Sequence, residues 1–185
     1  IRIILNQLME AMELEETKPK APVLVCLDEF PVLGFMKQLQ DAIGQIAGFG
    51  VKLWIIIQDW GQGEELYGKR WESFAANAGL VQAFGNTDLK TTKYLSERLG
   101  KTRIESTRDG EVSAEQRAKG LSGKSDAHEL YDLLTADEIS RIFNRADPSR
   151  RQLILYAGYK PMILQRVEYY DEKSPFWHLF RDKID

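Results

Sequence analysis

Cysteine, histidine and long apolar runs are scarce or missing in this sequence. Its 185 residues include one cysteine, Cys26, and two histidines, His128 and His178. A single thiol excludes a disulfide within the chain, and these three side chains do not make a credible set of zinc ligands. No apolar run approaches the roughly 18 residues of a membrane-spanning helix, and no signal-peptide pattern is visible. We therefore expect a soluble intracellular segment in which Cys26 is a small buried apolar side chain.

One phosphate-binding motif is also missing. The loop Gly-x-x-x-x-Gly-Lys-Ser/Thr wraps phosphate groups with backbone N–H groups and a lysine, and no segment has this spacing. The similar stretch from Gly120 to Ser125 has a compressed spacing and follows no apolar strand, so we interpret it as a flexible loop. Because the chain begins at Ile1 rather than at a methionine, we expect a piece of a longer protein.

Charge and composition set broad limits on fold and partners. Hydrophobic residues make up 43% of the chain, which is enough for one domain with a core of its own. The formal net charge is −3, so the composition gives no general support for nucleic-acid binding. Any contact with DNA must therefore be local.

The most informative segment is the apolar run from Val23 to Leu27, which ends in two adjacent carboxylates, Asp28 and Glu29. This pattern predicts a buried strand that delivers acid groups to the edge of a sheet. In nucleoside triphosphatases built on a parallel sheet, an Asp at this position holds Mg²⁺ through its water shell. The neighbouring Glu polarises the water that attacks the γ-phosphate.

A second predicted strand, residues 51–57, follows one helix later and ends at Gln58. The helix between the strands is expected over residues 35–46, because its apolar residues recur at helical spacing. A strand, helix and second strand in one sheet make the strands parallel, so Asp28, Glu29 and Gln58 should share one crevice at their carboxyl ends. There the amide can contact a γ-phosphate oxygen, although Gln58 can equally be a polar strand end without a role.

The remaining segments predict further elements of an α/β fold. A third strand is expected over residues 80–84, with Thr87 or Asp88 capping the helix that follows. A short strand over 102–106 leads into a polar stretch, residues 107–127, that we expect to be a flexible loop. Residues 152–157 and 162–167 have the pattern of an antiparallel hairpin that closes the sheet.

Three of these segments together resemble a known family. Leu27-Asp28-Glu29-Phe30, Ile56-Ile57-Gln58 and the turn at Gly85 to Asp88 before a helix ending in Leu99-Gly100 resemble the coupling-protein ATPases of conjugation and type IV secretion, the VirD4/TraG/TraD family. The resemblance implies that residues 1–185 are the C-terminal half of a RecA-like P-loop NTPase core. Its expected sheet is mostly parallel, with helices on both faces and a C-terminal antiparallel hairpin. The phosphate loop and the membrane anchor would lie upstream, so the fragment alone should be inactive.

The same resemblance implies a function for the full-length protein. It would be a hexameric, ATP-driven coupling protein at the cytoplasmic face of the bacterial inner membrane, with membrane contact only through the absent N-terminal segment. Its implied partners are a DNA–relaxase complex or effector proteins, and components of the type IV secretion channel. With ATP and Mg²⁺ as cofactors, Asp28 would bind the metal, Glu29 would activate water and Gln58 would sense the γ-phosphate.

Three basic residues are candidates for contact with DNA in a central channel, namely Lys37, Lys69 and Arg70. Lys69 and Arg70 lie near aromatic residues, a combination that can follow a phosphate backbone and stack on bases. Arg70 is also a candidate arginine finger, because this chain has Ala47 where family members often carry an Arg. An ordinary solvated turn explains Lys69 and Arg70 equally well.

Two other functions stay open at this point. The first is a DNA-translocating ATPase of the FtsK/HerA type, which shares the sheet and the positions of Asp28, Glu29 and Gln58. The second is a non-catalytic interaction domain that recruits substrate proteins.

Overall fold

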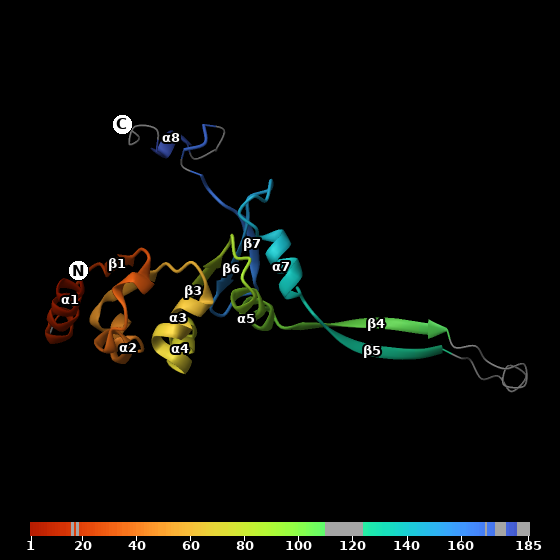
Figure 1. Cartoon of the computed structure of the whole chain (residues 1–185), viewed down its shortest axis with the longest axis horizontal. Coiled ribbons are helices and arrows are strands. Elements are labelled where there is room, and N and C mark those ends of the chain that lie inside the picture. The colour runs from red at the N-terminus through yellow and green to blue at the C-terminus, as the bar shows by residue number, and fades with distance from the viewer. Residues whose placement is uncertain (16, 18, 110–123, 169, 173–176, 181–185) are drawn as a thin grey trace, which may run out of the picture.

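The computed structural model describes residues 1–15, 17, 19–109, 124–168, 170–172 and 177–180. Figure 1 shows three groups of elements: the first two strands with the N-terminal helices, a second sheet in the middle of the molecule, and a long two-stranded ribbon that projects from it. None of the described helices combines the length and the apolar character needed to cross a membrane.

The first sheet is a parallel pair. Strand β1 (Val23–Leu27) and strand β2 (Val51–Ile55) are in register from Val23 opposite Val51 to Leu27 opposite Ile55. The chain between them forms the 3₁₀ helix η1 (Phe30–Leu33), helix α2 (Lys37–Ala42) and the 3₁₀ helix η2 (Ile46–Phe49). The predicted helix over 35–46 is therefore shorter than expected, because the chain turns after Ala42, whose carbonyl accepts from the Gln45 N–H at 2.8 Å.

One face of this pair packs against helices. They are α1 (Arg2–Leu14), α3 (Trp60–Tyr67) and α4 (Trp71–Asn77), with the 3₁₀ helix η3 (Gly68–Arg70) between the last two. Four aromatic rings, Phe30, Tyr67, Trp71 and Phe74, make the centre of the core, each at most 5% exposed. Helix α3 approaches this cluster closely, since a Cβ added to Gly63 would lie 2.0 Å from the Trp71 ring.

The other face of the parallel pair is open within the described part of the chain. Alternate residues of a strand point to opposite faces, and on this face Leu24 is 60% exposed and Trp54 53% exposed. Cys26 lies on the same face, opposite Trp54, and is exposed. The expectation of a buried Cys26 is therefore wrong, and the described helices that pack on this parallel pair cover its other face.

The second sheet is antiparallel. Strand β3 (Leu80–Ala83) pairs with β6 (Arg151–Tyr156), which pairs with β7 (Met162–Gln165). The α/β class and the closing hairpin are confirmed. Parallel pairing is limited, among the described residues, to β1 and β2, because β3 forms its ladder with β6 and not with β2.

Two helices cover this second sheet, α5 (Leu89–Leu99) and α7 (Ala136–Ile142). Helix α7 begins with the capping box that Thr135 and Glu138 form, in which each side chain bonds the other residue's backbone N–H. The second core is small: Ala83, Leu95, Ile139, Phe143 and Leu153.

The projecting ribbon consists of strands β4 (Lys101–Asp109) and β5 (Lys124–Asp132), which pair antiparallel along their whole length. The sequence predicts a strand over 102–106 and a loop over 107–127. In the structure the first strand is longer, and a second strand begins before the predicted end of the loop. Residues 107–109 and 124–127 belong to the strands, because cross-strand hydrogen bonds satisfy their backbone. Residues 110–123 lie outside the described part. A last short helix, α8 (Trp177–Phe180), follows near the end of the chain.

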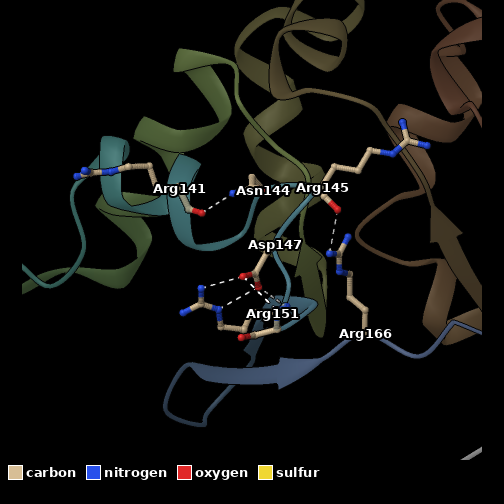
Figure 2. A network of polar contacts seen from close by, with 7 residues as sticks. Arg141, Asn144, Arg145, Asp147, Arg151 and Arg166 are labelled. Atoms are coloured by element: carbon tan, nitrogen blue, oxygen red, sulfur yellow. Dashed lines mark hydrogen bonds and ion pairs between the residues drawn. The ribbon is translucent and has the colours of Figure 1, made fainter. Parts of the chain in front are cut away.

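A buried carboxylate organises the turn that leads into β6 (Figure 2). The Asp147 side chain is 2% exposed and lies 2.9 Å from the Arg151 guanidinium. It also accepts from the Arg151 backbone N–H at 2.7 Å and from the Arg151 Nε at 3.0 Å. The side-chain hydrogen bond from Arg151, followed by the backbone one, holds the pKa of Asp147 well below its ordinary value.

We expect Asp147→Asn to lower the melting temperature by several degrees, because it leaves Arg151 without its charged partner. The pKa of Asp147 is depressed in the folded state, so its contribution is complete above the unfolded pKa of about 3.9 and is lost as pH falls through the folded value. The difference between wild type and variant should thus be constant from neutral pH to about pH 5 and shrink below about pH 4. Thermal unfolding monitored by circular dichroism at several pH values measures this.

Asp137→Asn is the matched control, because Asp137 and Arg141 form the same four-residue spacing with side chains 75% and 70% exposed. An exposed pair contributes little to stability. Equal effects of the two substitutions would contradict the role of burial at Asp147.

Candidate functional site

The two carboxylates that end β1 lie on a short segment that is fixed at both ends. The Ile56 N–H donates to the Leu27 carbonyl at 3.1 Å, and the Phe30 N–H donates to the Ile56 carbonyl at 3.1 Å. In a regular parallel ladder one residue separates these two bonds, whereas here two residues do. Asp28 and Glu29 therefore bulge out of the ladder, and both side chains are exposed.

The bulge requires an unusual backbone at Glu29. Its φ is 50° and its ψ 47°, the left-handed region that non-glycine residues rarely adopt. Its N–H donates to the Asp28 Oδ1 at 3.1 Å, which draws the first carboxylate over the turn. Strain of this kind persists only where the surroundings enforce it, and it is concentrated at functional sites.

The buried side chain of Phe30 holds Glu29 in this conformation. Its ring is 0% exposed and stacks on Tyr67 at 5.8 Å and on Trp71 at 6.2 Å between ring centroids. Burial of this ring directly after Glu29 fixes where the backbone must go. The three-residue pattern Asp-Glu-Phe thus combines two solvent-facing acids with an anchor in the core.

Gln58 lies at the matching end of the second parallel strand. Its backbone N–H donates to the Gln62 Oε1 at 3.3 Å, and Asp59 caps helix α3 by accepting from the Gln62 N–H at 3.0 Å. The Gln58 side chain is exposed. Because β1 and β2 are parallel and in register, Asp28, Glu29 and Gln58 lie at one edge of the sheet, as the sequence predicts.

The second sheet reaches the same edge through Asn86. The Asn86 Nδ2 donates to the Gln58 carbonyl at 3.3 Å. Nearby, the Trp60 N–H donates to the Thr91 Oγ1 at 2.8 Å, and Asp88 caps α5 by accepting from the Thr91 N–H at 2.8 Å. Of the two predicted capping residues, Thr87 and Asp88, the structure has Asp88 as the cap. The contact of Asn86 with Gln58 was not predicted.

The three basic candidates form no ion pair with Asp28 or Glu29 in the described part of the chain. Lys37 is paired with Asp41 at 2.6 Å, and the pKa of Asp41 is lowered first by the hydrogen bond from Lys37 and further by the charge of Arg70. Lys69 lines an open depression of about 750 Å³ between α3 and α5. Among the described residues, Asp28 accepts from the Glu29 N–H, and none of the three basic residues donates to it.

The oxygen groups at the strand ends suit a hard cation beside a phosphate. Mg²⁺ keeps several waters and is usually bound through one or two carboxylates together with substrate phosphates. Asp28 and Glu29 are two exposed carboxylates held on one rigid bulge, and Gln58 adds a neutral amide. The side chains at this edge are thus of the types that bind a hydrated Mg²⁺ beside a phosphate.

Comparison with known sequences identifies the family. Residues 1–183 match the family described as Type IV secretory system Conjugative DNA transfer. The chain is 29% identical over 178 residues to the type IV secretion system-coupling protein VirD4 of Bartonella quintana (strain Toulouse), covering 94% of the chain and 26% of that protein. It is 30% identical over 152 residues to the conjugal transfer protein TraG of Escherichia coli, covering 77% of the chain and 24% of that protein. The chain thus spans about a quarter of the length of these relatives.

Solved structures of a bacterial conjugative coupling protein have the same fold. The unbound TrwBdeltaN70 matches with a TM-score of 0.65 and 17% identity, covering 92% of the chain and 38% of that protein. TrwB in complex with ADP and Mg²⁺ matches with a TM-score of 0.63 and 18% identity, covering 90% of the chain and 36% of that protein. By its sequence match over nearly the whole length, this chain belongs to the family of coupling proteins for type IV secretion and conjugative DNA transfer.

Proposed function

We propose that this chain is the hydrolytic half of the motor in an ATP-driven coupling protein, which delivers DNA or protein substrates to a type IV secretion or conjugation channel. One observation carries the proposal: Asp28 and Glu29 bulge from a parallel ladder and share its carboxyl edge with Gln58. Ligands of open α/β sheets bind at this edge. Family membership over residues 1–183 supports the transport role.

The three side chains would divide the work of phosphoryl transfer. Asp28 would hold Mg²⁺ through its water shell, and Glu29 would accept a proton from the attacking water. Gln58 would contact the γ-phosphate and orient that water. The bound metal neutralises charge that develops on the phosphate. A TrwB structure in complex with ADP and Mg²⁺ and another with an ATP analogue support ATP and Mg²⁺ as the cofactors.

Assembly would complete the motor. We propose a hexamer at the cytoplasmic face of the bacterial inner membrane, with membrane contact through an N-terminal segment outside this chain. Its partners would be a DNA–relaxase complex or effector proteins on one side and channel components on the other. Lys37 and Lys69 would face DNA in a central channel, and Arg70, exposed at the end of η3, would serve as a finger toward a neighbouring subunit in place of the residue at Ala47.

The proposal predicts ATP-dependent movement of DNA by the full-length protein. We expect ATP hydrolysis that DNA stimulates, together with displacement of a triplex-forming strand from a DNA track, which reports translocation. The double substitution Lys69→Gln and Arg70→Gln should weaken the stimulation of ATP hydrolysis by DNA severalfold, because it removes two neighbouring positive charges that would contact DNA phosphates. Glu97→Gln, an exposed change on α5, is the control.

The outcomes separate the alternatives. An interaction domain without catalysis would show neither hydrolysis nor translocation, which would reject the proposal. A translocase of the FtsK/HerA type would move DNA but would not co-purify with channel components. A coupling protein does both.

A further inference from the structure

Five arginines gather where the second sheet meets the end of α7. Three of them are paired with carboxylates: Arg141 with Asp137, Arg150 with Asp171 and Glu168, and Arg151 with Asp147. The other two, Arg145 and Arg166, have no carboxylate partner among the described residues. These two guanidinium groups are therefore the ones in the cluster whose charge no described carboxylate offsets.

The side chain of Arg166 contacts the backbone of Arg145. The Arg166 Nη2 donates to the Arg145 backbone carbonyl at 3.2 Å, and the Arg166 guanidinium lies 5.3 Å from the centre of the Phe84 ring. The Arg166 Nε is buried, and no described residue accepts its proton. Figure 2 shows the Arg145 side chain extending away from Asp147, so the ion pair at Asp147 does not use it.

The pair lies at the carboxyl end of β3. The Gly85 N–H donates to the Phe143 carbonyl at 2.6 Å, which brings the end of α7 against this strand end. A Cβ added to Gly85 would lie 3.8 Å from the Arg145 Cβ. The next residue, Asn86, donates to the Gln58 carbonyl at 3.3 Å. Gly85, beside Arg145, is thus followed directly by Asn86, the residue that contacts Gln58.

An arginine pair in this setting suits a phosphate group better than it suits other anions. The planar guanidinium presents several donors in a fork that matches phosphate oxygens, and hydrogen bonds between charged partners are the stronger kind. Stacking on Phe84 limits the positions that Arg166 can take.

We propose that Arg145 and Arg166 form a phosphate-binding pair at the carboxyl end of β3, which binds a phosphate group of the nucleotide whose metal and water Asp28 and Glu29 hold. The proposal rests on the proposed function for the identity of the ligand. The pair approaches the site from the side of the second sheet, through Asn86 and Gln58. It would thereby bring positive charge to the phosphate from the side of the second sheet.

Binding of inorganic tripolyphosphate to the 185-residue chain tests the pair without hydrolysis. We expect Arg145→Gln or Arg166→Gln each to weaken binding about tenfold or more, because each removes a charge-assisted hydrogen bond. Arg141→Gln, one turn away and exposed with its partner Asp137, should weaken binding less than about twofold. Isothermal titration measures the affinities, and circular dichroism checks that each variant is folded.

Arg166→Lys keeps the charge with less change to the fold and should bind with intermediate affinity. The proposal would be overturned if Arg141→Gln lost as much tripolyphosphate affinity as the other two variants. It would also be overturned if Arg145→Gln and Arg166→Gln both bound tripolyphosphate as tightly as the wild type. Weakened binding of a single-stranded oligonucleotide with tripolyphosphate binding intact would overturn it too, because the pair would then contact DNA. Failure of the proposed function would give a different result. Glu29→Gln would then leave ATP hydrolysis unchanged, while the tripolyphosphate affinities of the wild type and the arginine variants would stay as predicted.

Discussion

Glu29→Gln in the full-length protein should reduce ATP turnover by a factor of about 10² to 10⁴ while nucleotide affinity changes little, because general-base catalysis contributes that much and the amide cannot accept the proton. The structure gives this glutamate a position that its own backbone does not favour, with φ at 50°. The two hydrogen bonds of Ile56 and the buried Phe30 ring hold it there. Steady-state ATPase assays and titration with a fluorescent nucleotide measure the two quantities.

Glu29→Gly separates chemistry from folding at the same position. Glycine avoids the steric penalty of about 1–2 kcal/mol for a left-handed backbone but loses about 0.4–1 kcal/mol more conformational entropy on folding. This variant should therefore be at least as stable to urea as the wild type, while turnover is lost as in Glu29→Gln. Glu97→Gln removes an exposed carboxylate elsewhere and should leave turnover unchanged. Normal turnover in Glu29→Gln would refute the assignment of Glu29 as the base.

Phe30→Ala should destabilise the chain by about 3–5 kcal/mol, which is the usual effect of truncating a fully buried phenylalanine. The ring is 0% exposed and contacts Tyr67, Trp71 and Phe74 with centroid distances of 5.8, 6.2 and 6.0 Å. Urea unfolding followed by tryptophan fluorescence is a direct measurement, because Trp71 belongs to the same cluster. Turnover of the full-length variant should also fall, since the turn at Glu29 loses its anchor.

Phe35→Ala provides the comparison. Phe35 is 46% exposed and has its closest ring contact with Tyr67 at 5.4 Å, so its truncation should cost less than half as much. A loss at Phe30 no larger than the loss at Phe35 would show that the ring does not anchor the segment.

The sequence was sufficient to predict the edge that carries the site. The alternation of apolar residues, the spacing of two strands around one helix and the polar residues at their ends predict a parallel unit, and the structure has β1 and β2 parallel with Asp28, Glu29 and Gln58 at one edge. These patterns are local, and a short connection joins the two strands, so the pairing could be predicted from neighbouring residues alone.

Features that depend on distant segments could not be predicted in the same way. The partner of β3 is β6, about 70 residues later in the chain, and no local pattern in residues 80–84 identifies that partner. The exposure of Cys26 follows from which face of the pair the helices cover. The positive φ of Glu29 follows from the core position of Phe30.

The arginine pair shows the same limit. Arg145 and Arg166 lie 21 residues apart, and both the ladder of β6 with β7 and the position of the segment after α7 bring them to one strand end. The hairpin predicted over residues 152–157 and 162–167 would pair residue 157 with residue 162, whereas the structure pairs Ile154 with Met162. The hairpin was therefore predicted, but its register was not. The position of α7 could not be predicted either, because it depends on the hydrogen bond from the Gly85 N–H to the Phe143 carbonyl.

The hydrogen bond between Asn86 and Gln58 has a mechanical consequence. The two sheets share no ladder in the described residues, so displacement of one reaches the other through a few discrete links. One of these links ends on the backbone of the residue that would detect the terminal phosphate. A change of nucleotide state that moved Gln58 would therefore pull on β3, and through it on the base of the projecting ribbon, which gives this chain a short path from chemistry to motion.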